Sequence, residues 1–188
     1  ILFDAVQHGE PLNMVIWRDG KKLQIDLPVY KNNADRISGN QYDTLPPYLL
    51  VGGLVFTELS TNYCNSLGHD WLENFHTNVL HELLYRAFQD EAGARATPIV
   101  LSEILKHPSN IDFGVYTKSV LTKLNGQTIN SMQDLLHALD ASEDDYHRFE
   151  FLSGQVEALR RDDAEQANAQ LLQAYQIPQA YRIEAQHD

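Results

Sequence analysis

The stretch "YLLVGGLVF", residues 48–56, places two glycines inside the most strand-like run of the chain. Glycine weakens a strand interior because it costs backbone entropy on folding and packs no side chain. Gly52 and Gly53 therefore have two interpretations. They mark either a bulge within one strand or a loop whose backbone must come close to another group.

The composition around this stretch excludes several classes of protein. The chain has 188 residues, of which 43% are hydrophobic, so it can bury a core. Its net charge is −12 and it has no Lys/Arg-rich run, which argues against a nucleic-acid partner. No apolar run is long enough to span a bilayer. The chain begins "ILFDAVQ" without an initiator Met, and we expect it to be part of a longer protein.

The elements that flank the glycines mix strands and helices. "PLNMVIWRDGKKLQIDLPV" predicts a hairpin that turns at Asp19-Gly20, after a helix end that closes at Gly9. Residues 31–46 have the composition of a linker. Strands are expected over 48–59, 97–105 and 119–129, a hairpin over 146–161, and helices over 70–88, 131–140 and 162–177. This order predicts an α+β fold with an antiparallel sheet.

Polar residues indicate where these elements begin and turn. Asp70 is the expected N-cap of the first helix. Ser131 is the expected N-cap of the second helix, and Asp134 closes its capping box. Asn125-Gly126 and Ser153-Gly154 predict tight turns between strands.

The serine, cysteine and histidine residues of the chain match no catalytic or metal-binding motif. No serine lies in a GxSGG or GxSxG context, and the lone Cys64 is interpreted as a buried or incidental thiol, because a reactive one needs a specific basic neighbourhood. The HExxH pattern fails because Tyr85 stands where the second histidine belongs. A small metal-dependent hydrolase that uses His69, His76 and His81 is kept only as an alternative hypothesis. We therefore expect no catalytic residue, no metal and no cofactor.

The glycine stretch and the later capped helix suggest a groove instead. An extended peptide can add to an exposed strand edge while loop N–H groups hold its terminal carboxylate. Glycines at 52 and 53 allow the backbone to approach that carboxylate.

Four blocks carry a family resemblance: "PPYLLVGGLVFTELS", "TPIVLSEILKHPSNIDFG", "VLTKLNGQTINSMQDLLHALD" and "LLQAYQIPQAY". Together and in this order they resemble the second PDZ domain of Deg/HtrA-type serine proteases, in the plant-Deg-like subgroup and its bacterial relatives. The resemblance covers about residues 45–182. "VIWRDGKKLQIDL" resembles the hairpin that closes many PDZ domains of this family.

The resemblance implies a PDZ-like, partly open antiparallel β-barrel or sandwich with capping helices and an enlarged helical insertion. It divides the chain into the helix end and hairpin of a preceding PDZ domain (1–29), a linker (30–46), a second PDZ domain (47–182) and a tail (183–188). Its loop, Val51-Gly52-Gly53-Leu54, departs from the usual x-Φ-G-Φ pattern. The implied peptide- or partner-binding residues are Leu50, Val51, Gly52, Gly53, Leu54, Val55, Phe56, Met132, Leu136 and Leu139.

The implied function is a non-catalytic, regulatory protein-interaction region of a serine endopeptidase. Its expected partners are peptides and other PDZ domains of the same protease, within a homo-oligomer. The family suggests an extracytoplasmic (periplasmic) or organellar location. A stand-alone PDZ scaffold without a protease is the alternative, and a GxSGG-bearing domain encoded upstream of Ile1 would decide between the two.

Overall fold

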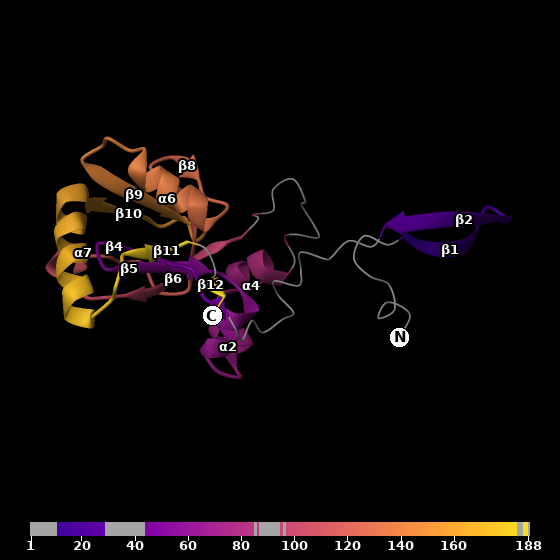
Figure 1. Ribbon diagram of the computed structural model, residues 1–188, viewed down its shortest axis with the longest axis horizontal. Coiled ribbons are helices and arrows are strands. Elements are labelled where there is room, and N and C mark those ends of the chain that lie inside the picture. Colours follow the sequence, from indigo (N-terminus) through magenta and orange to yellow (C-terminus); the bar gives the residue numbers. More distant parts are fainter. Residues whose placement is uncertain are drawn as a thin grey trace. The chain divides into compact units, whose positions relative to one another are not determined.

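The computed structural model describes residues 11–28, 44–84, 86, 95, 97–183 and 186–187. The chain divides into two compact units, residues 1–38 and 39–188, which are described separately (Figure 1). The expected helix end before Gly9 and most of the expected linker lie outside the described residues. No helix in the described part of the chain is both long and apolar enough to cross a membrane.

The first unit contains the predicted hairpin, β1 (Pro11–Arg18) and β2 (Lys21–Pro28). Asp19 and Gly20 have φ values of 54° and 74°, as a two-residue hairpin turn requires. Because directly opposed residues share a face of the sheet, the register gathers apolar side chains on one side. That face consists of Leu12, Met14, Ile16, Leu23, Ile25 and Leu27.

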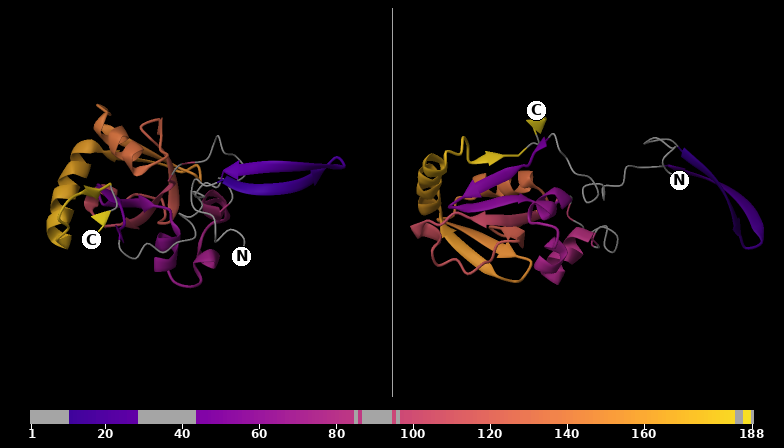
Figure 2. Two further views of the ribbon diagram at one scale, coloured as in Figure 1. Left: turned by 45° about the vertical axis from the view of Figure 1, so that its right-hand side comes forward. Right: turned by 90° about the horizontal axis from the view of Figure 1, so that it is seen from below.

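The second unit is built on one antiparallel sheet with the strand order β10-β9-β7-β6-β5-β4-β11, and β8 pairs with β7 (Figure 2). Its strands are β4 (Tyr48–Val51), β5 (Leu54–Glu58), β6 (Ile99–Ile104), β7 (Ser119–Leu124), β8 (Gln127–Thr128), β9 (Tyr146–Phe151), β10 (Val156–Arg160) and β11 (Tyr181–Arg182). A separate ladder joins β3 (Thr44–Leu45) to β12 (Gln186–His187). The α+β class and the antiparallel sheet are confirmed.

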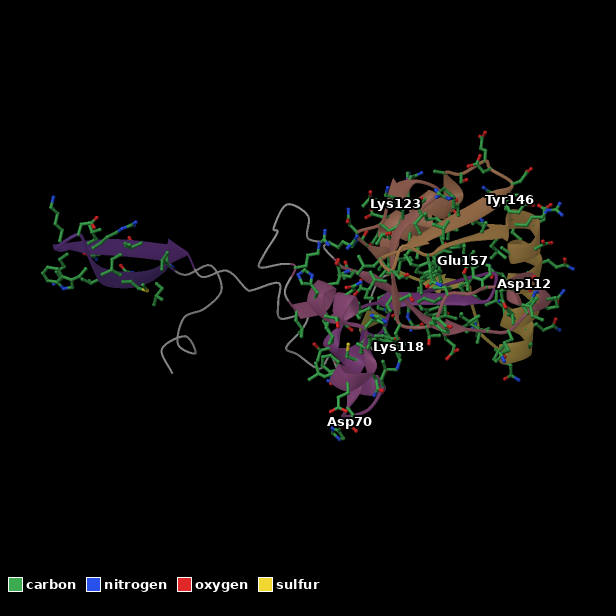
Figure 3. All side chains as sticks on the ribbon, turned by 180° about the vertical axis from the view of Figure 1, so that it is seen from behind. Asp70, Asp112, Lys118, Lys123, Tyr146 and Glu157 are labelled. Atoms are coloured by element: carbon green, nitrogen blue, oxygen red, sulfur yellow. The ribbon has the colours of Figure 1, made fainter. Side chains whose placement is uncertain are left out.

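The long helix expected over residues 70–88 is wrong. Within that range the chain forms two shorter helices, α3 (Trp71–Asn74) and α4 (Thr77–Leu84), and α2 (Thr61–Ser66) precedes them. Phe75 is extended, with φ −101° and ψ 144°, and its buried ring meets Trp71 and Tyr63 edge to face. The amino group of Lys118, labelled in Figure 3, lies 5.8 Å from the Phe75 ring centroid. Packing of the buried Phe75 therefore interrupts the helix, although the apolar residues keep helical spacing on both sides of it.

The other two helices follow the sequence pattern. α6 (Met132–Asp140) begins after Ser131, whose Oγ accepts a hydrogen bond from the Asp134 backbone N–H at 3.1 Å. The Asp134 carboxylate reaches one residue further back and accepts from the Asn130 N–H. α7 (Arg161–Tyr175) ends at Gln176 in the left-handed conformation. Asp70 occupies the N-cap position of α3 but makes no side-chain capping bond.

The core lies between the sheet and its helices. Its main cluster includes Phe56 and Phe149, whose rings stack with centroids 5.7 Å apart. A smaller cluster joins Leu50 of β4 to Ala167 and Leu171 of α7. Figures 1 and 2 show α7 and the α2–α4 group at opposite ends of the sheet.

A short 3-10 helix, η1 (Pro108–Asn110), follows β6. It contributes the buried side chain of Asn110 to the region around the two glycines.

Candidate functional site

The two glycines form the turn between β4 and β5. Val51 pairs with Leu54, so Gly52 and Gly53 are the two central residues of a tight hairpin. Their φ values are 58° and 90°, which matches the all-positive turn favoured by the twist of paired strands. The glycines therefore do not mark a bulge in one strand.

Both glycines also lie where a side chain would collide. A Cβ on Gly53 would meet Asn110 Nδ2 at 2.3 Å and the Leu105 carbonyl oxygen at 2.4 Å. A Cβ on Gly52 would meet Leu159 Cδ2 at 2.1 Å. Close approach to other parts of the protein itself thus requires glycine at both positions.

Two asparagines hold the polar groups of this turn. The Gly52 N–H donates to Asn168 Oδ1 at 2.8 Å, and Asn168 Nδ2 donates to the Leu50 carbonyl at 3.2 Å. Asn110 Nδ2 donates to the carbonyls of Gly52, at 2.7 Å, and Leu105, at 3.0 Å. The Gly52 N–H, one of the groups expected to hold a peptide carboxylate, already has a partner within the chain.

The expected peptide-pairing strand lies inside the sheet. Leu54, Val55 and Phe56 belong to β5, which pairs with β4 on one edge and β6 on the other. Both edges of β5 are therefore occupied in this structure. The outer edge of β4 is covered in turn by β11.

The expected pocket residues of α6 differ in exposure. Met132 is fully buried in the main core cluster. Leu136 and Leu139 are partly buried and pack against that same cluster, which also contains Leu49 of β4. The structure thus brings the α6 residues and the β4–β5 hairpin to one core, with Leu136 and Leu139 at its boundary.

The sequence alone did not point to three residues that hold this region, Asn110 and Asn168 at the turn and Arg182, whose guanidinium donates to the Pro46 carbonyl beside β4. The sequence does indicate that Asn168 is unusual, because this polar residue interrupts a helical stripe of buried apolar residues, Ala164, Ala167 and Leu171. A polar side chain beside such a stripe must find a hydrogen-bond partner. Its partners lie 116 and 118 residues away, so the sequence does not reveal them.

The titratable side chains do not assemble a catalytic group in the described ranges. Burial raises the pKa of Cys64 to about 11, so the thiol stays protonated at neutral pH. Burial, together with Cys64 and Glu103, raises the pKa of Tyr63 to about 12. His69, His76 and His81 are exposed, and the described residues contain no group of three or more potential ligands placed to hold a metal ion.

His147 of β9 is the buried histidine of this sheet. Burial lowers its pKa, and the nearby Arg161 guanidinium lowers it further. Its Nδ1 atom has no hydrogen-bond partner among the described residues. The side chain therefore favours the neutral form.

Comparison with known proteins gives a family and three relatives. The family described as "PDZ domain" matches residues 37–182. Protease Do-like 2, chloroplastic, of Arabidopsis thaliana is 32% identical over 84% of this chain and 24% of its own length. Protease Do-like 4, mitochondrial, and putative protease Do-like 3, mitochondrial, of the same plant are 22% and 21% identical, over 94% and 88% of this chain and 30% and 27% of their own lengths. The chain thus spans about a quarter to a third of the curated relatives that it matches.

Proposed function

Because the chain belongs to the PDZ domain family, we propose that it is the non-catalytic protein-interaction region of a Do-like (Deg/HtrA) serine protease. Its role is contact with other PDZ domains of the same protein, assembly of the oligomer and binding of substrate peptides. The similarity to three Do-like proteases supports the identity of the parent protein. Hydrolysis belongs to a part of that parent outside this chain.

The proposed organisation has two PDZ-related parts. Residues 1–29 are the closing helix end and hairpin of a preceding PDZ domain, 30–46 a linker, 47–182 the second PDZ domain and 183–188 a tail. The apolar face of the β1–β2 hairpin supports this division, because two strands alone bury too little surface to be stable in water. In this proposal the rest of the preceding domain packs on that face.

The pairing of β5 on both edges is the observation that carries the assembly role. A peptide that is to pair with β5 must first displace β4. Capture of a carboxylate by the Gly52 N–H must also displace Asn168. Contacts that leave these internal partners in place must use the outer surface of the domain.

One such surface is the segment that follows η1. Ile111 and Tyr116 are each 78% exposed. The segment between them is held against the β9–β10 hairpin, because the Gly114 N–H donates to Glu157 Oε1 at 2.9 Å and Gln155 Nε2 donates to the Gly114 carbonyl at 3.1 Å. Presenting apolar side chains on a fixed backbone reduces the entropy lost on binding. We assign this Ile111–Tyr116 patch to contact with a PDZ domain of a neighbouring subunit.

Sedimentation velocity over a range of concentrations tests the proposal. We expect the chain to self-associate, or to co-sediment with the parent protease, and Ile111→Ser combined with Tyr116→Ser to weaken that association. Leu72→Ser combined with Tyr175→Ser is the matched control, since these side chains are 51% and 56% exposed elsewhere in the domain. A chain that stays monomeric and does not bind its parent contradicts the assembly role.

A further inference from the structure

The outer edge of β4 is a strand-addition site that the chain fills with its own residues 179–183, here named the clasp segment. We propose that the clasp segment competes with an incoming extended peptide for this edge, and that the peptide recognised there carries an arginine followed by an aliphatic residue. This inference deepens the peptide-binding part of the proposed function and rests on it. It moves the binding edge from β5, where the sequence placed it, to β4.

The backbone of the clasp segment pairs as a peptide ligand would. Tyr181 lies opposite Leu49 and Arg182 lies opposite Tyr48, in antiparallel register. The Leu50 N–H donates to the Ala180 carbonyl at 2.7 Å, which extends the pairing by one residue. Backbone bonds of this kind do not depend on side chains, so another extended segment can make them equally well.

Arg182 supplies a specific anchor. Its Nε and Nη2 atoms both donate to the Pro46 carbonyl, at 3.2 Å and 2.8 Å. Its guanidinium carbon lies 5.1 Å from the centre of the Tyr48 ring, in a cation–π arrangement. Tyr48 in turn donates its hydroxyl to the carbonyl of Gln179 at 2.8 Å. Since a lysine lacks the planar fork of an arginine, these contacts select arginine.

Ile183 supplies the apolar anchor. It is partly buried and packs against the main core cluster, at whose boundary Leu136 and Leu139 of α6 also pack. These are two of the three α6 residues that the sequence assigned to a ligand pocket. A side chain from outside that takes the place of Ile183 therefore needs to be aliphatic and of similar size.

The clasp segment is held weakly enough to leave. β11 has two residue pairs with β4, whereas β5 has five with β6. Tyr181 is 47% exposed, and the Arg182 bonds lie at the protein surface. Helix α7 ends before the segment at the left-handed Gln176, so the clasp segment can detach without unwinding that helix. Segments with few buried contacts open at a lower free energy than the domain core.

A fluorescein-labelled peptide with the sequence of residues 178–184, PQAYRIE, tests the proposal by fluorescence polarisation on the full chain. Apparent affinity is reduced by the fraction of molecules whose site is free. The double variant Arg182→Ala with Ile183→Ala weakens the internal competitor, so it should bind the peptide at least about tenfold more tightly than the unaltered chain. Arg160→Ala, which removes an exposed arginine at the end of β10, is the matched control and should change nothing.

A second peptide, with alanine at the positions of Arg182 and Ile183, tests the recognised chemistry. We expect it to bind the double variant at least about tenfold more weakly than PQAYRIE does. Equal binding of the two peptides, or equal affinity of the altered and unaltered chains for PQAYRIE, overturns the proposal. If the double variant does not fold, Arg182→Ala alone is used, and it must still bind more tightly than the unaltered chain.

Amide exchange on the unaltered chain provides an independent measurement. The Leu50 N–H, which donates to Ala180, should exchange at least about tenfold faster than the Phe56 N–H of β5. If Leu50 exchanges only as slowly as Phe56, the clasp segment does not open separately and the inference fails. These measurements are independent of the Ile111–Tyr116 patch, so failure of the clasp leaves the assembly role standing.

Discussion

Replacement of Gly53 by alanine should destabilise the domain far more than the same change at a matched turn glycine. Gly53 and Gly126 occupy the same position, the second central residue of a two-residue hairpin, with φ values of 90° and 79°. They differ in their surroundings, because a Cβ on Gly126 would have no neighbour within 4 Å. Comparing the two variants therefore separates the cost of backbone strain, which both share, from the cost of close approach, which only the Gly53 variant has.

The expected loss of unfolding free energy follows from the contacts around each glycine. A left-handed conformation costs an alanine about 1–2 kcal/mol, and both variants share this cost. A Cβ on Gly53 also displaces Asn110 Nδ2, which donates to the carbonyls of Gly52 and Leu105. Each carbonyl left buried without a donor costs about 1–3 kcal/mol. Gly126→Ala should thus cost about 1–2 kcal/mol, and Gly53→Ala, which adds two unpaired carbonyls, about 3–8 kcal/mol.

Urea unfolding is the appropriate assay, with far-UV circular dichroism and Trp71 fluorescence as paired probes. A Trp17→Phe background removes the emission of the exposed tryptophan of the hairpin in the first unit. Gly52→Ala should fall between the other two variants, because the side chain that it meets, Leu159, can shift more easily than backbone. Equal losses of unfolding free energy for Gly53→Ala and Gly126→Ala would refute the reasoning.

Three further predictions concern other parts of the domain. Asn168→Ala should lower the unfolding free energy by about 2–3 kcal/mol in the same assay, because it removes the partner of the buried Gly52 N–H. A loss below about 0.5 kcal/mol would contradict this prediction. The unfolding free energy should fall as the pH drops below about 6.5, since burial lowers the pKa of His147 and the unfolded chain then binds more protons. His147→Gln should flatten that dependence, whereas His137→Gln, at an exposed site, should leave it intact. The chain alone should not cleave casein, and cleavage that survives repurification and is abolished by a serine-directed inhibitor contradicts this.

Local chemistry made the turns predictable. Asp19-Gly20 and Asn125-Gly126 each combine a residue that tolerates positive φ with a glycine, and both form two-residue hairpins. Gly52 adopts a φ of 58°, close to the 51° of Asn125, so its backbone conformation by itself does not demand a glycine. Its turn alone would accept an asparagine, and the close contacts with Leu159 and Ala164 are what disfavour one there.

Long-range pairing could not be predicted in the same way. Alternation of side chains indicates which face of a strand is buried, but it does not indicate which edges are paired. Leu54 and Phe56 are buried, and the segments that cover the outer edges of β5 and β4, β6 and β11, come from distant parts of the sequence. The interruption at Phe75 was missed for a related reason, since Trp71 and Phe75 keep helical spacing across an extended residue.

The ladder that closes the second unit determines how the domain responds to tension. β3 and β12 pair Thr44 with His187, and β4 and β11 continue the same antiparallel order with Tyr48 opposite Arg182. A force that pulls residues 44 and 187 apart therefore loads one residue pair at a time, from the outside inwards, as in a zipper. The clasp segment separates from β4 before that force reaches the interior strands. Tension on residues 44 and 187 would thus expose the outer edge of β4 before it loaded the interior strands.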